Sequence, residues 1–255
     1  VQTWLSFRCW RLFSSGDLLR PAWLLIAFSG LAQLAGGALR IAALPSPLNP
    51  LTFLPASAGR RLMSWAAICG PLFSPIYMLF LAGGLFYVVR ACRQHGILGR
   101  LRALDILLLS IALVYTTNFV ATVIFAPTQS TSTTFTQTVL SWTSDPLLCL
   151  LLFQAILVRR SVANMGWGLI ARCWLSFTAA IFLTSVGDIG LWAWSKGVLP
   201  HVLEIASWYI WFLASAAYAL GPAFQLQAML HATLGGVIEG APNDIEPATW
   251  RAGCA

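Results

Sequence analysis

Charged side chains are scarce in this chain, and lysine is nearly missing. Asp, Glu, Lys and Arg make up only 9% of the 255 residues, while 58% are hydrophobic. A soluble domain carries about 25% charged residues, so the shortage excludes a soluble globular protein. It predicts an all-α fold, a polytopic integral membrane helical bundle in which helices satisfy the backbone polar groups.

The signatures of several enzyme and metal-binding classes are also missing. The six cysteines show no CxxC or CxxCH spacing, and no HExxH, GxSxG or GxxxxGK[ST] motif occurs. His95, His201 and His231 fall in loops or at segment ends, so no pair inside a segment can ligate haem or a di-iron centre. The only lysine, Lys196, lies in a turn, which leaves no Schiff-base site for retinal. We expect no enzyme activity, no metal site and no cofactor.

The net charge of +7 does not indicate nucleic-acid binding, because the arginines cluster at the ends of apolar runs. There they set orientation and contact lipid headgroups. We therefore expect the lipid bilayer as a partner and no nucleic acid. We take the preference for arginine over lysine as an indication of a GC-rich bacterial genome, which predicts the bacterial inner (cytoplasmic) membrane.

Six apolar segments are long enough to cross a bilayer, which takes about 20 helical residues. They run over residues 19–44, 61–89, 103–126, 139–158, 169–194 and 202–230. We expect three parts: an interfacial amphipathic segment over 1–18, a single transmembrane bundle over 19–230 and a polar cytoplasmic tail over 231–255.

Small residues and prolines predict the local geometry of these segments. Small residues permit close helix packing at Gly30, Ala32, Gly36 and Gly37 in the first segment, and at Ala217 with Gly221 in the last. The second segment contains the run Gly70–Pro75 with two prolines, and proline removes a backbone donor, so a kink or break is expected there. Asp105, three residues after Arg102, is explained by a local ion pair.

The distribution of basic residues orients the bundle. Cytoplasmic ends carry the excess of arginine and lysine, and with both termini inside eleven basic residues are cytoplasmic and four external. The four external ones are Arg40, Arg60, Arg61 and Lys196. We therefore expect about six transmembrane helices with both termini cytoplasmic, and the three acids Asp145, Asp188 and Glu204 on the external side.

The stretch 186–211 is the strongest candidate site, because it puts two carboxylates inside neighbouring apolar segments. Asp188 precedes the connecting turn and Glu204 follows it, so both lie at a similar depth. A tryptophan stands four residues after each acid, Trp192 and Trp208, on the same helix face. A carboxylate in hydrocarbon costs about 2.5–3.5 kcal/mol on insertion scales and normally faces the bundle interior or a wet cavity.

Asp145, near the external start of the fourth segment, joins these residues as a ligand-binding candidate. Arg60, Arg61 and Lys196 are candidate counter-ions on the same side. The three acids fit either a cation or proton site, a cluster with raised pKa values, or a ring of structural ion pairs with the basic residues.

Part of the second half resembles a known family. Its motifs are Asp145-Pro146-Leu147-Leu148, Arg159-Arg160, Gly187-Asp188-Ile189, and Glu204 followed by Trp208. Over residues 145–223 this order resembles the multi-helix membrane sensor region that precedes GGDEF diguanylate cyclase domains in bacterial signalling proteins. Such regions usually feed a cytoplasmic catalytic domain and often have eight helices, whereas here six segments are followed by a tail of about twenty-five residues.

Three functions remain open from the sequence. The first is a non-enzymatic membrane module, sensory or ligand-binding, with an acidic and aromatic pocket on the external side and a cytoplasmic output partner. The second is an accessory transmembrane subunit of a larger energy-transducing or pigment-bearing complex, with other membrane subunits as partners. The third is a small cation- or proton-coupled carrier, which requires the broken second segment to face the acids.

Overall fold

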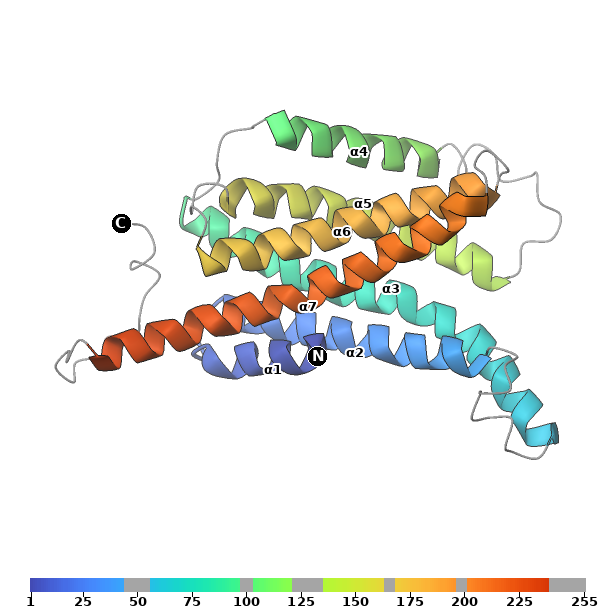
Figure 1. Cartoon of the computed structure of the whole chain (residues 1–255), viewed down its shortest axis with the longest axis horizontal. Coiled ribbons are helices and arrows are strands. Elements are labelled where there is room, and N and C mark those ends of the chain that lie inside the picture. The colour runs from blue at the N-terminus through green and yellow to red at the C-terminus, as the bar shows by residue number, and fades with distance from the viewer. Residues whose placement is uncertain (44–55, 97–102, 121–134, 163–167, 196–200, 239–255) are drawn as a thin grey trace.

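The computed structural model folds the chain into an all-helical bundle (Figure 1), which confirms the predicted class. It describes residues 1–43, 56–96, 103–120, 135–162, 168–195 and 201–238, with only the backbone described at several helix ends. Within these residues the chain forms seven α-helices. They are α1 Gln2–Leu12, α2 Leu19–Ala43, α3 Ala56–Gln94, α4 Ala103–Phe119, α5 Phe135–Val162, α6 Leu169–Ser195 and α7 His201–Ile238.

Each predicted apolar segment corresponds to one of the helices α2 to α7. By length and composition, three described stretches are able to cross a membrane: Leu19–Ala42, Ala58–Gln94 and Leu169–Leu191. The apolar part of α4, Ala103–Thr117, is shorter. At the other end of the chain, α7 continues to Ile238, beyond the predicted end near residue 230, and the rest of the predicted tail lies outside the described residues.

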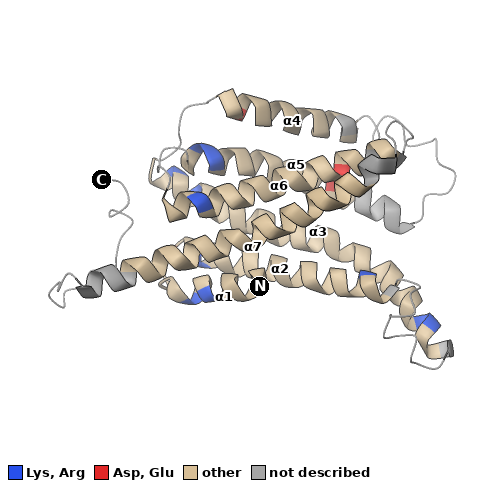
Figure 2. Ribbon diagram, in the orientation of Figure 1, with Lys and Arg blue, Asp and Glu red and all other residues tan. Residues whose placement is uncertain are grey.

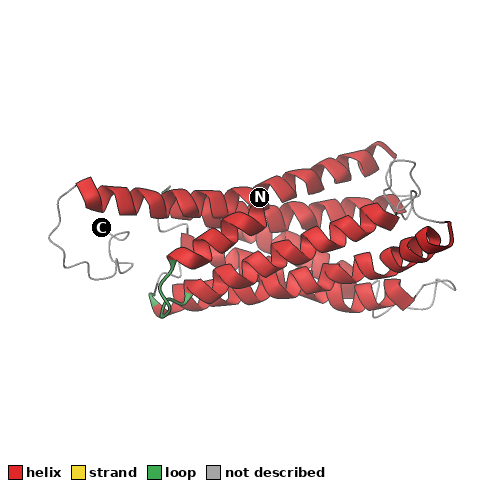
Figure 3. Ribbon diagram, turned by 90° about the horizontal axis from the view of Figure 1, so that it is seen from below, coloured by secondary structure: helices red, strands yellow, loops and turns green. Residues whose placement is uncertain are grey.

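The helices pack in a ring whose order differs from the order in the chain. Neighbouring pairs are α2 with α3, α3 with α5, α5 with α6 and α6 with α7, while α4 packs on the outside of α5 (Figure 1). Figure 3 shows from a second side that the helices run roughly along one common direction. The short α1 contacts both α2 and α7 and so closes the ring. Because α1 is much shorter than its two neighbours, it fills only part of the gap between them (Figure 1).

Two contacts fix how far α1 reaches along its neighbours. A Cβ on Gly30 of α2 would lie 2.7 Å from the Thr3 hydroxyl oxygen, so the two helices touch there. On the other side, the Cys9 thiol donates to the Pro222 carbonyl of α7 at 3.5 Å. Burial raises the pKa of this thiol to about 12, which keeps it protonated as a donor.

Helix α3 crosses α2 at glycines. A Cβ on Gly36 would lie 2.7 Å from the Phe73 Cβ, and one on Gly70 would lie 3.2 Å from the Arg40 backbone nitrogen. The close packing predicted at Gly36 is therefore confirmed. Of the predicted kink or break, the break does not occur, because α3 is one continuous helix that contains both Pro71 and Pro75. The helix is curved rather than straight (Figure 1), as proline-containing helices commonly are.

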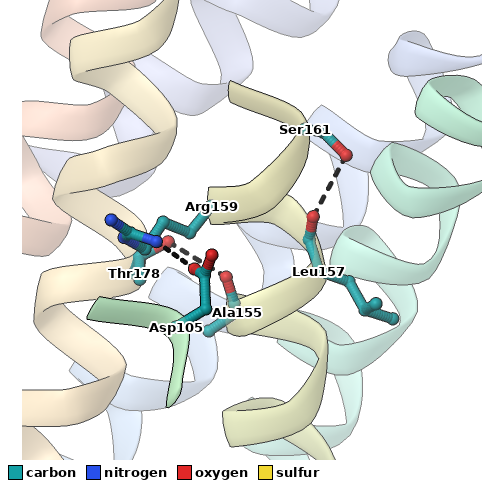
Figure 4. Close-up of polar contacts among 6 residues, drawn as sticks. All are labelled: Asp105, Ala155, Leu157, Arg159, Ser161 and Thr178. Atoms are coloured by element: carbon teal, nitrogen blue, oxygen red, sulfur yellow. Dashed lines mark hydrogen bonds and ion pairs between the residues drawn. The ribbon is translucent and has the colours of Figure 1, made fainter. Parts of the chain in front are cut away.

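Helix α4 is tied to the bundle by an ion pair. Asp105 is fully buried and accepts a bond from the Arg159 guanidinium of α5 (Figure 4). The partner expected for Asp105, Arg102, lies outside the described residues. Nearby, the Thr178 hydroxyl of α6 lies 3.4 Å from the Ala155 carbonyl of α5 and 3.0 Å from the Trp174 carbonyl of its own helix.

We expect Asp105→Ala to lower the free energy of unfolding by about 3–5 kcal/mol, because it leaves the Arg159 charge buried without this partner. Denaturant titration in detergent measures the change. The double variant Asp105→Leu with Arg159→Met should recover most of the loss, since it removes both charges. Ser110→Ala, an exposed position on α4 whose hydroxyl bonds its own helix, is the control and should stay within about 0.5 kcal/mol of the unchanged protein.

Candidate functional site

A cavity of about 640 Å³ lies inside the bundle and is lined by all six long helices, α2 to α7. Its α2 lining begins at Ala32 and ends at Arg40, just beyond the Gly30 contact with α1. Its α7 lining runs from Trp211 to Tyr218 and stops before Pro222, the other α1 contact. The cavity therefore occupies the half of the ring into which α1 does not reach.

Two of the predicted acids meet in this cavity. Asp145 of α5 and Asp188 of α6 both line it, and their charges are close enough to repel each other. Arg40 of α2 also lines the cavity and attracts Asp188 electrostatically. If both carboxylates are ionised, the lining carries two negative charges against one positive charge. Figure 2 shows acidic residues toward one end of the packed α5, α6 and α7, and most of the basic residues toward the other.

Glycines let α7 approach α6 on both sides of Asp188. A Cβ on Gly187 would lie 2.5 Å from the Trp211 ring, and one on Gly190 would overlap the Ser207 hydroxyl. The Trp211 indole nitrogen donates to the Thr184 carbonyl at 3.3 Å and also lies within hydrogen-bonding reach of Asp188. The small residues thus bring an indole N–H against a carboxylate inside the bundle.

Three tyrosines surround the acids. Tyr77 of α3, Tyr115 of α4 and Tyr218 of α7 all line the cavity. The Tyr115 hydroxyl is bonded to the Asp145 carboxylate across α4 and α5. This bond agrees with the interhelical role expected for polar groups inside a membrane segment.

Ser144 is buried beside Asp145 without a partner. Its side chain is 8% exposed and lines the cavity, and its hydroxyl makes no hydrogen bond to the protein. Leaving a buried hydroxyl unpaired costs about 1–3 kcal/mol. A partner that enters the cavity would remove this cost.

The other candidate residues are either outside the described part of the structure or away from the cavity. Glu204 and Trp192 fall within α7 and α6, but their side chains lie outside the described part of the structure, as does Lys196. Arg60 and Arg61 are exposed near the start of α3 and do not line the cavity.

Trp208, predicted as a ligand-binding residue, does not line the cavity either. Its side chain is 56% exposed and packs edge-on against Trp211, with ring centroids 5.1 Å apart. Ser207 and Trp211 both pack against glycines of α6. One further residue turns a helix by about 100°, so Trp208 points away from that contact face.

Several lining residues were not predicted as site residues. Arg40 was recognised only as an external basic residue, and Tyr77, Tyr218 and Ser144 were not singled out. One signal was available for Tyr77, which lies two residues after Pro75 in the segment where a kink or break was expected. For Arg40, Tyr218 and Ser144, no spacing in the sequence links them to the acids.

Among the described residues, no group of three or more His, Cys, Asp or Glu side chains is arranged to hold a metal ion. The comparisons with known proteins add no assignment. No family model, no curated protein and no solved structure matches this chain.

We expect Gly187→Ala to destabilise the protein by about 1–3 kcal/mol, because the new methyl group meets the Trp211 ring at 2.5 Å. Thermal unfolding monitored by tryptophan fluorescence measures the change. Gly37→Ala is the matched control, since nothing lies within 4 Å of the new methyl group. It should be neutral or slightly stabilising, as alanine favours a helix. Equal effects of the two variants would contradict the proposed close packing at Gly187.

Proposed function

We propose that this chain is a non-enzymatic, multi-pass membrane module that binds a ligand in the cavity and passes the resulting change to a partner. One observation carries the proposal: carboxylates from two separate helices, Asp145 and Asp188, line one cavity of about 640 Å³. Ligand sites typically measure 300–1,000 Å³ and combine apolar walls with a few convergent polar groups. The resemblance of residues 145–223 to membrane sensor regions points in the same direction.

The proposal includes six spans, α2 to α7, with both termini in the cytoplasm and the cavity open toward the outside of the bacterial inner membrane. The charge distribution supports this orientation. Most basic residues lie toward one end of the bundle, opposite the acids around the cavity (Figure 2). By the positive-inside rule, the end rich in arginine is cytoplasmic.

The long helix α7 is the proposed route from the cavity to the partner. Trp211 and Tyr218 line the cavity, and Pro222, one turn later, accepts the bond from Cys9 of α1. A ligand that alters the α6–α7 contact would shift this carbonyl and the helix that holds it. In this proposal the partner is a cytoplasmic output protein, whereas other membrane subunits belong to the second candidate function.

An accessory subunit of a larger complex is the second candidate, and the outer face of α7 favours it. Trp208, Tyr209 and Phe212 are 56%, 68% and 71% exposed. Aromatic residues are enriched in protein interfaces. The carrier alternative is less well supported. α3 does face the acids, through Gly70 to Tyr77, but it lacks the break that this alternative requires.

The first test asks whether the cavity holds a small molecule. The full chain is purified in mild detergent from its native membrane and analysed by native mass spectrometry. We expect one bound small molecule and no stoichiometric protein partner. Asp188→Asn should lower its occupancy at least tenfold, because a hydrogen bond to a charged group contributes about 1.5–3 kcal/mol.

Asp17→Asn is the matched control for that test. Asp17 caps the start of α2 by accepting from the Leu19 backbone N–H at 2.8 Å, and asparagine can do the same. It makes the same chemical change away from the cavity, so the bound mass should persist. A fixed set of co-purifying chains with an empty cavity would favour the subunit instead.

The orientation has its own test. In intact cells, Ser215→Cys, an exposed cavity position, should react with a membrane-impermeant maleimide added outside. Ser14→Cys, in the connection between α1 and α2, should react only after the cells are opened. The unchanged chain gives the background from its own cysteines. The reverse labelling pattern would overturn the orientation.

A further inference from the structure

The cavity is also chemically selective. We propose that its ligand is a small organic cation, a protonated amine on a flat apolar body, with the ammonium held between Asp145 and Asp188. This inference rests on the proposed function, because it assumes that the cavity binds a ligand at all. It adds the chemical class of that ligand.

Charge is the first reason. Among the Asp, Glu, Lys, Arg and His side chains that the structure describes, those lining the cavity are Asp145, Asp188 and Arg40. Two carboxylates against one guanidinium leave the ionised cavity with a negative charge, which disfavours an anion. The stem of Arg40 lies against Gly70, and its side chain is exposed rather than enclosed. The two acids therefore remain available to a second cation.

The walls of the cavity are the second reason. Aromatic side chains from three helices, α3, α4 and α7, line the cavity with the acids. They are Phe73, Tyr77, Tyr115, Phe119, Trp211 and Tyr218. Aromatic faces attract cations through their quadrupole, and cages of such rings recognise ammonium groups. A volume of about 640 Å³ is far larger than a bare ion requires, so the aromatic walls are suited to an organic body.

Ser144 is the third and independent reason. Ser144 lines the cavity, and its buried hydroxyl has no hydrogen-bond partner. A primary ammonium carries three N–H donors and no acceptor. Asp145, Asp188 and Ser144 offer one acceptor side chain for each of these donors. A proton shared by the two acids would leave both the hydroxyl and the aromatic walls unused.

The test uses matched probes and the full chain in lipid nanodiscs. Each set keeps one aromatic body and carries an amine, an alcohol or a carboxylate at its end. The phenyl set is 2-phenylethylamine, 2-phenylethanol and 3-phenylpropanoate. The indole set is tryptamine, tryptophol and indole-3-propionate. Binding is read from the shift in thermal stability and from displacement of the co-purified molecule in native mass spectrometry. We expect the amine of at least one set to bind at least tenfold more tightly than its alcohol, and the carboxylate not to bind.

Variants assign the binding to the proposed residues. Asp145→Asn and Asp188→Asn should each weaken amine binding at least tenfold, and Ser144→Ala should weaken it several-fold. Asp17→Asn should leave it unchanged. If Asp188→Asn does not yield folded protein, Asp145→Asn and Ser144→Ala decide the matter, because both are small changes at positions on α5.

The outcomes separate the two proposals. If an alcohol or carboxylate binds as well as its amine, or if the co-purified molecule carries no amine, the ligand class is wrong while the ligand-binding function stands. If no probe binds and nothing co-purifies with the folded protein, both proposals fail. Amine binding that survives both asparagine variants would also overturn the assignment to the two acids.

Discussion

The length of α1 determines where this bundle can be hollow. An 11-residue helix is about 16 Å long, whereas the 25 residues of α2 extend about 37 Å. A helix that fits between α2 and α7 therefore seals about half of their common length. The sealed half is filled by aromatic packing, with Trp23, Trp174 and Phe177 all within 6.0 Å of one another by ring centroids. The other half has no equivalent filler, and the cavity lies there.

The hollow explains how the bundle tolerates two acids. A carboxylate in hydrocarbon is costly, and two neighbouring ones add mutual repulsion. Asp145 receives the Tyr115 hydroxyl, while Asp188 has the Trp211 indole and the Arg40 charge nearby. Each acid thus has one close donor from a neighbouring helix, fewer than its two oxygens can accept. Both retain acceptor capacity toward the cavity. The Asp105–Arg159 pair differs, because there a full opposite charge meets the buried acid directly.

The sequence predicted the helices well, because long apolar runs report directly on burial in a membrane. It also singled out Asp145 and Asp188, which the structure brings to one cavity, since an acid in such a run has few tolerable positions. The sequence did not predict which residues line the cavity where this depends on the rotation of a helix about its axis or on contacts between distant segments. Trp208 illustrates the first failure, because its spacing from Glu204 says which residues share a face but not which face meets α6.

Arg40 and Tyr77 illustrate the second failure. They come from different helices, and only the crossing of α2 and α3 at Gly36 and Gly70 brings them beside the acids. Of the kink or break expected in α3, the break is absent for a related reason. A proline removes one donor, but the remaining turns and the contact with α2 hold the helix together. The prolines therefore predicted where the hydrogen bonding of α3 is weakened, while its packing against α2 determined that the helix stays continuous.

The same packing makes α7 the element most sensitive to what fills the cavity. Its contact with α6 relies on glycines opposite Ser207 and Trp211, where there is little room for adjustment. Close-packed interfaces shift between discrete arrangements rather than deform smoothly. A body pressed against Trp211 must therefore move the helix rather than one ring. Further along α7, Gly221 packs against Phe177 of α6, and the neighbouring Pro222 accepts the bond from Cys9 of α1. A movement of α7 is therefore passed directly to α1. The short helix that leaves the cavity open is thus also the element best placed to register its occupation.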